Sequence, residues 1–217
     1  MEITEGGDLE KLREILKNPT LIETADINAF PILHCASLYA QDDTLILSPD
    51  KDEKWTTPSR IVQTSGEYME LVRLLIAMGA DVSGEGGEEA LIAAGYNGDV
   101  ETAEILLAKG VTKGREKALL MAAFEGHIEV GRVLLEDGTD PNRASAYDIR
   151  YGTRYMGNES KPLIAASSEG HTEFAEMLLD YEANVNLPNY DGSTAVSSAE
   201  ENGYTETVAL LKSRGAK

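Results

Sequence analysis

One phrase recurs along this chain and constrains its fold more than any other feature. The clearest copy is 126–142, GHIEVGRVLLEDGTDPN, and 170–186 repeats it as GHTEFAEMLLDYEANVN. The copies start at Gly7, Glu67, Gly98, Gly126, Gly170 and Gly203. A phrase repeated this often predicts a solenoid of stacked supersecondary units rather than one globular core.

The phrase predicts an amphipathic helix that runs into a tight turn. In the copy at 126–142, the apolar residues share one helical face, because they recur at three- and four-residue steps. Gly138 is suited to the left-handed cap, and Pro141 stops the helix from continuing. Upstream, KALLMAAF at 117–124 predicts a shorter helix, so each unit is a helix pair joined at Gly126.

The spacing and the turn motifs identify a family. Gly170 and Gly203 lie 33 residues apart, the period of about 33 residues that is typical of ankyrin repeats. The motifs that carry the resemblance are LHCA at 33–36, KPLIAA at 161–166, DGSTA at 191–195, the Gly-His pairs at 126 and 170, and the helix ends GADVS, GTDPN and EANVN. The chain resembles the ankyrin-repeat family along nearly its whole length. A tetratricopeptide array would lack the Asp-Gly-Ser-Thr turn.

The resemblance implies an all-α ankyrin-repeat solenoid of about six helix-turn-helix repeats, with β-turn fingers and two insertions. We expect a single domain over 1–217. Its predicted parts are an amino-terminal cap at 1–26, a repeat at 27–83 with an insertion at about 41–66, repeats at 84–112 and 113–142, a repeat at 143–186 with an extended finger at 143–160, and a carboxy-terminal cap repeat at 187–217. Departures from the family are the missing Thr-Pro-Leu-His motif, the short connection 110–116, and Glu182 where Gly is usual.

Charge and composition narrow the class of partner. The chain has 38 acidic and 19 basic residues and a net charge of −19, which repels phosphate backbones and argues against nucleic acid. The same field favours a basic protein partner, although solubility alone also explains it. A lone cysteine, no signal sequence and no long apolar run predict a soluble, monomeric, cytoplasmic protein that contacts no membrane. A piece of a longer chain would show the same features.

The residue types predict no catalytic site, no metal site and no cofactor. His34 and Cys35 are adjacent, so on a helix they point apart. The resemblance implies that His34 bonds a neighbouring turn, and His127 and His171 repeat with the array, so we expect all three histidines to be structural. The acidic residues near position 50 lack the glycine and the final glutamate of an EF-hand loop.

Two sets of residues are candidates for partner binding. Leu38, Tyr96 and Phe124 align near the ends of the first helices, which the resemblance places along a concave groove. The finger set is Tyr147, Arg150, Tyr151, Arg154, Tyr155 and Tyr190. Tyrosine and arginine commonly anchor interfaces. In the alternative interpretation, the groove side chains belong to the core, and the finger side chains pin their loop and neutralise nearby carboxylates.

These observations predict a non-catalytic protein–protein interaction module or scaffold that binds through its groove and fingers. The alternative is a regulatory or targeting ankyrin domain of a larger enzyme or signalling protein. A third, weaker hypothesis places a small-molecule or metal site in the insertion at 41–66.

Overall fold

The computed structural model describes residues 48–49, 55–56, 69, 72–73, 76–77, 79, 81–146 and 159–217. Contacts within the chain define two compact units, residues 1–90 and 91–217. Three predicted parts lie outside the described residues: the cap at 1–26, the helix that would carry Leu38, and the segment 147–158 of the finger. Of the insertion predicted at about 41–66, the structure describes 48–49 and 55–56.

In the first unit, β1 (Ser48–Pro49) pairs antiparallel with β2 (Trp55–Thr56). Ser48 lies opposite Thr56, and Pro49 lies opposite Trp55. Farther along, Met69, Val72 and Ile76 are helical and buried. Their three- and four-residue spacing places them on one face, as expected for the second helix of a repeat.

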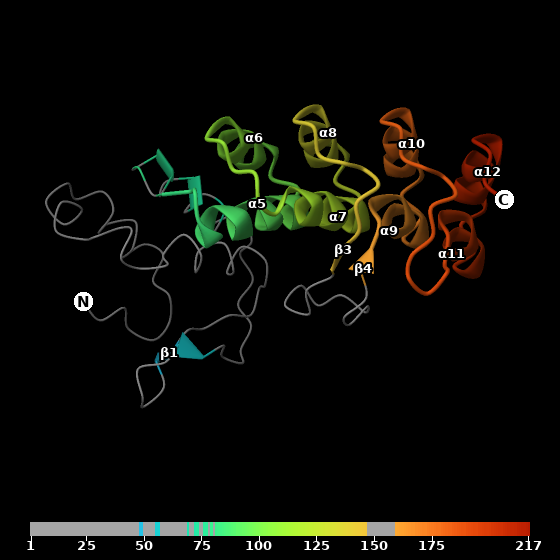
Figure 1. Cartoon of the computed structure of the whole chain (residues 1–217), viewed down its shortest axis with the longest axis horizontal. Helices are drawn as coiled ribbons and strands as arrows, with labels where there is room; N and C mark the ends of the chain where they lie inside the picture. Colours follow the sequence, from blue (N-terminus) through green and yellow to red (C-terminus); the bar gives the residue numbers. More distant parts are fainter. Residues whose placement is uncertain are drawn as a thin grey trace, which may run out of the picture. The chain divides into compact units, whose positions relative to one another are not determined.

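The second unit is an array of helix pairs (Figure 1). The array follows α5 (Glu85–Asn97), whose carboxy-terminal half belongs to this unit. Its other helices are α6 (Val100–Ala108), α7 (Arg115–Glu125), α8 (Ile128–Glu136), α9 (Pro162–Ser168), α10 (Thr172–Asp180), α11 (Ala195–Glu201) and α12 (Thr205–Ser213). Between α8 and α9, β3 (Ser145–Ala146) pairs antiparallel with β4 (Glu159–Ser160) at the base of the extended finger.

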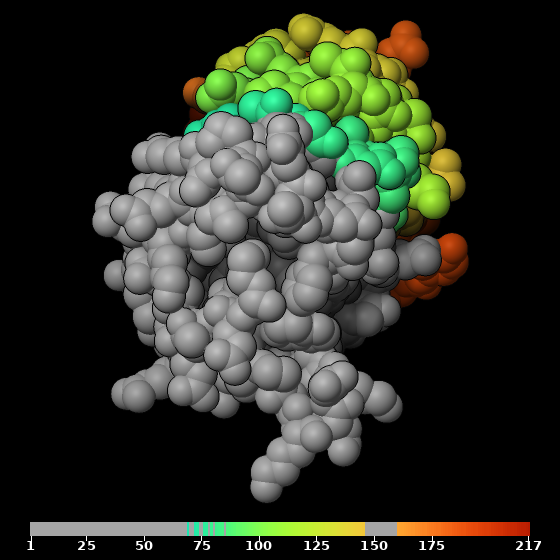
Figure 2. Space-filling view, turned by 90° about the vertical axis from the view of Figure 1, so that its left-hand side faces the viewer, coloured from blue at the N-terminus to red at the C-terminus, as the bar shows by residue number. Residues whose placement is uncertain are grey.

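The helices form two rows. In one row α7 packs on α9 and α9 on α11, while α6, α8, α10 and α12 pack in sequence in the other (Figure 1). Within repeats, the second helix packs on the first: α8 on α7, α10 on α9, and α12 on α11. Seen from one end, successive repeats lie behind one another, so green, yellow and orange residues appear in turn (Figure 2). Each repeat therefore contacts its immediate neighbours, as stacked units do.

Short side chains allow this close stacking. Residues 118–123 of α7 are all buried, and three of them are alanines. A Cβ atom at Gly95 of α5 would collide with the backbone of Ala118, so only glycine permits the approach of the two helices there. In the other row, Gly131 of α8 leaves the space that the ring of Phe174 from α10 fills. Small residues on one repeat thus match large residues on the next.

Local chemistry sets the helix ends. Asp99 caps α6 by accepting a hydrogen bond from the backbone N–H of Thr102 at 3.0 Å. Thr194 and Ser197 form a reciprocal capping box at the start of α11. Gly126, with φ of 79°, ends α7 in the left-handed conformation and turns the chain into α8. The helix expected at 117–124 is therefore present as α7, which starts two residues earlier.

Candidate interaction surface

In three successive repeats, a ring packs on the inter-helix glycine of the repeat before it. His127 lies on Gly98, His171 on Gly126, and Tyr204 on Gly170. A Cβ atom at Gly126 would sit 2.8 Å from the ring of His171. Each of these glycines also has a positive φ, so both the backbone and the ring require glycine at this position.

The two histidines also bond the preceding repeat. Nε2 of His127 donates to the carbonyl oxygen of Tyr96, and Nε2 of His171 donates to that of Phe124, each at 2.9 Å. Burial lowers the pKa of His127, and the charge of His171 lowers it further, against the hydrogen bond to Tyr96. Both rings therefore join neighbouring repeats through a hydrogen bond to a backbone carbonyl group, which is the structural role expected for them.

The structure describes only part of the predicted binding set. Leu38, Tyr147, Arg150, Tyr151, Arg154 and Tyr155 lie outside the described residues. Tyr96 and Phe124 are partly buried and occupy equivalent places near the ends of α5 and α7. Their backbone carbonyl groups accept the hydrogen bonds from the histidines of the next repeat. The two positions therefore contribute to repeat stacking through the backbone, independently of what their rings contact.

Tyr190 is the most exposed large apolar side chain in the described part of the chain, at 85%. It lies at the tip of the turn between α10 and α11, which we call the last finger (187–194). The finger is closed by a hydrogen bond from the N–H of Asn189 to the carbonyl oxygen of Ser193, at 2.8 Å. The backbone N–H and the hydroxyl of Ser193 both donate to Asp191, and these bonds lower the pKa of its carboxyl group. An aromatic ring is thus presented on an ordered turn.

The last finger is fastened to the base of the extended finger. Nζ of Lys161 donates to the carbonyl oxygen of Pro188 at 2.7 Å. The side chain of Asn189 bonds both the N–H of Lys161 and the hydroxyl of Ser160, each at 3.3 Å. Ser160 belongs to β4, which pairs with β3. The bases of the two fingers therefore form one continuous edge, and the segment predicted to carry the tyrosines and arginines falls between β3 and β4 in the sequence.

Two carboxylates lie at equivalent places in neighbouring repeats. Glu125 and Glu169 each directly precede the inter-helix glycine. Burial raises the pKa of Glu125, and the negative charge of Glu169 raises it further. Sequence reasoning missed this pair, although both residues occupy the same position of the repeated phrase. It also missed the role of Tyr204, which follows its glycine as the two histidines follow theirs.

Two negative findings apply to the described residues alone. No three His, Cys, Asp or Glu side chains gather there closely enough to hold a metal ion. No helix there combines the length and the apolar composition needed to cross a membrane.

The stacked helix pairs, the glycine-ring joints and the connecting fingers define a repeat solenoid. The family described as ankyrin repeats (3 copies) matches this chain over residues 60–145 and 147–217, which is well over half of it. The chain belongs to the ankyrin-repeat family, as the resemblance predicted, and the all-α solenoid is confirmed with it. Ankyrin repeats imply protein–protein interaction.

Two curated relatives share a shorter stretch. The probable E3 ubiquitin-protein ligases XBOS32 and XBOS33 of Oryza sativa subsp. japonica are each 39% identical to this chain over 62 residues. That stretch is 29% of this chain and 12% of either relative, so the chain matches a small part of their length.

Proposed function

We propose that this chain is a non-catalytic scaffold that holds a protein partner on its fingers and along its first helices. The observation that carries the proposal is the exposed ring of Tyr190 on a hydrogen-bonded finger. A tyrosine on a turn whose backbone is already ordered loses less conformational freedom when a partner covers it, and large aromatic side chains frequently dominate binding energy.

The proposed partner is a basic segment of a protein. The net charge of −19 attracts cationic chains over long range and repels nucleic acids. The Glu125–Glu169 pair supports this choice. Burial and the charge of Glu169 both raise the pKa of Glu125, and a cation between the two carboxylates would relieve the second of these effects. The proposal includes a soluble, monomeric scaffold in the cytoplasm.

The alternative is that the chain is the partner-recognition domain of a larger protein. The matched relatives are named as probable E3 ubiquitin-protein ligases, and the chain covers 12% of their length. In that case the finger edge would select the protein on which a separate domain acts.

Affinity capture from cell extract tests the finger. We expect Tyr190→Ala to lose a partner that the parent chain captures, and Tyr190→Phe to retain most of it, because the ring provides the contact area. Loss of a hot-spot side chain weakens binding by about 30-fold or more. Glu173→Ala, a change at an exposed residue of α10, is the matched control.

A second variant addresses the rest of the edge. Tyr151→Ala, Arg154→Ala and Tyr155→Ala together should weaken capture further if the extended finger belongs to the same surface. Each variant is compared with the parent by thermal unfolding, so that lost capture is not mistaken for lost folding. Equal capture by the parent and by both finger variants would refute binding on the fingers.

A further inference from the structure

The last helix pair has less apolar packing against its neighbour than the pair before it. Thr207 of α12 occupies the place that Phe174 holds in α10. Both side chains are buried, but Thr207 contributes a hydroxyl group that lies 2.7 Å from the hydroxyl of Thr172. The ring of Tyr204 over Gly170 adds one apolar contact at the joint. The helix α12 therefore packs with fewer buried apolar side chains than α10 does, and polar contacts make up a larger share of its packing.

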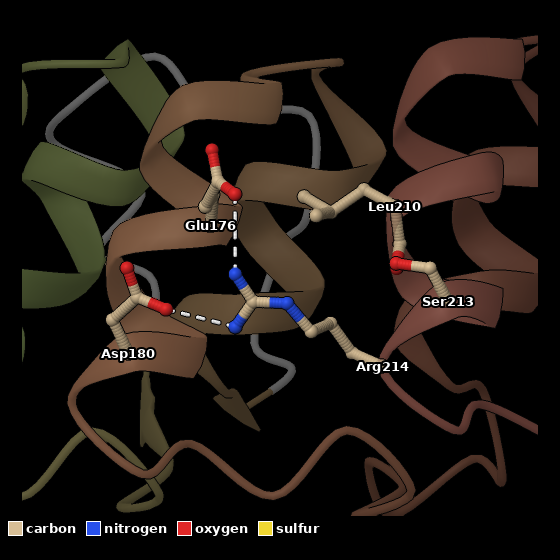
Figure 3. Close-up of polar contacts among 5 residues, drawn as sticks. All are labelled: Glu176, Asp180, Leu210, Ser213 and Arg214. Carbon is tan, nitrogen blue, oxygen red and sulfur yellow. Dashed lines mark hydrogen bonds and ion pairs between the residues drawn. The ribbon is translucent and has the colours of Figure 1, made fainter.

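One of these contacts is a charged fork. Arg214 ends α12 and reaches two carboxylates on α10, one helical turn apart (Figure 3). Its Nη1 lies 2.8 Å from Asp180 Oδ1, and its Nη2 lies 3.1 Å from Glu176 Oε1. The planar guanidinium group matches such a pair, and its charge also complements the carboxyl end of α12.

The fork is particular to the last joint of the described array. A different tie recurs: Asn142 bonds the carbonyl oxygen of Glu182, and Asn186 bonds that of Gly215 in the same way. At the position equivalent to Arg214, the preceding repeat has Tyr181, whose hydroxyl donates to Glu136 at 3.3 Å. The joint between α8 and α10 thus combines a hydrogen bond from an uncharged donor with the apolar Phe174 contact.

We propose that α11–α12 opens as a separate unit of the array and that the Arg214 fork is the latch that holds it closed. Stacked repeats are stabilised by their neighbours, so a helix pair whose contacts in the described array are chiefly to α9 and α10 can open while the rest remains folded. All three charged groups are partly exposed, and salt screens such pairs. Ionic strength therefore sets how often the pair opens, and opening uncovers the sides of α9 and α10 that the pair covers.

Hydrogen–deuterium exchange of the full chain, read by mass spectrometry, tests the latch. At low salt, Arg214→Ala should raise exchange in 195–213 by about threefold to tenfold and leave α7–α10 unchanged. Arg214→Lys, which keeps the charge without the fork, should fall between the parent and the alanine variant. At about 1 M salt, exchange in the parent should approach that of Arg214→Ala, because the screening length is then about 3 Å.

Lys212→Ala is the matched control, because it also removes one positive charge from α12. Lys212 pairs with Glu200 at 2.6 Å, so its ion pair lies within the last helix pair and does not join it to α10. We expect this variant to exchange like the parent. Equal acceleration in the two alanine variants would overturn the proposal, and so would acceleration of α9–α10 together with α11–α12 or an absence of any salt effect.

Discussion

Glu182 has a left-handed backbone that glycine adopts at the equivalent place in other repeats. Its φ is 66°, and the corresponding Gly110, Gly138 and Gly215 have φ of 84°, 89° and 93°. A side chain in this conformation costs roughly 1–2 kcal/mol relative to right-handed backbone. Glycine in its place has an opposing effect. It lowers the stability of the folded chain by roughly 0.5–1 kcal/mol, because it increases the conformational entropy of the unfolded chain. The difference predicts that Glu182→Gly stabilises the array by about 0.5–1 kcal/mol.

Thermal and urea unfolding measure this effect. For a chain of this size, the gain should raise the melting midpoint by roughly 1–4 °C. The carbonyl oxygen of residue 182 should still accept from Asn142, because the bond uses the backbone. Gly138→Ala is the reciprocal variant: a Cβ atom at Gly138 meets nothing within 4 Å, so its cost isolates the backbone conformation. We expect it to destabilise by about 1 kcal/mol.

Glu182→Ala separates the effect of the left-handed backbone conformation on stability from the effect of the carboxylate charge. This variant removes the carboxylate and keeps a Cβ atom in the left-handed conformation. If it stabilises as much as Glu182→Gly, relief of charge repulsion explains the gain and the backbone argument is wrong. A loss of stability in Glu182→Gly would refute it as well.

Three further substitutions have predicted outcomes. Replacing glycine by alanine normally stabilises a solvent-exposed helix. Gly131→Ala should instead destabilise the chain by about 1–3 kcal/mol in urea unfolding, because the new methyl group meets the ring of Phe174. Adding Phe174→Leu to this variant should recover part of the lost stability. Thr139→Val should stabilise by about 1 kcal/mol in the same assay, because Oγ1 of Thr139 is buried without a hydrogen-bond partner. The lowered pKa of His127 means that the unfolded chain binds its proton first, so the free energy of unfolding should fall as pH drops below about 6.5 and level off below the folded pKa. His127→Gln, measured from pH 7.5 to 5.5, should show a shallower slope, and an unchanged slope would contradict this assignment.

The repeated phrase was sufficient to predict the helix pairs and the family. Apolar residues spaced for one helical face, a glycine between helices and a turn-forming end are local signals, and each recurs several times. The structural role of His127 and His171 could also be read from their recurrence after glycine. The role of Tyr204 could not be read in the same way, because its residue type differs and only its position matches.

The candidate binding residues show that a local sequence pattern does not predict the exposure of a side chain. Tyr96 and Phe124 align in the sequence, but alignment does not state how far a ring is covered by the next repeat, and the structure places both as partly buried. Tyr190 reads as one more tyrosine beside a turn. Only the bonds from its finger to Lys161 and Ser160 show that it is presented on an ordered edge.

The sequence by itself determined which segments are helical, where they turn and that they stack, because helix periodicity and glycine turns act over a few residues. The tertiary structure decided which side chains meet between repeats. Arg214 lies 38 residues from Glu176, and Gly131 lies 43 residues from Phe174, so neither contact leaves a local pattern. Such pairs follow from how neighbouring repeats are rotated and offset, and that geometry results from the packing of all their side chains together.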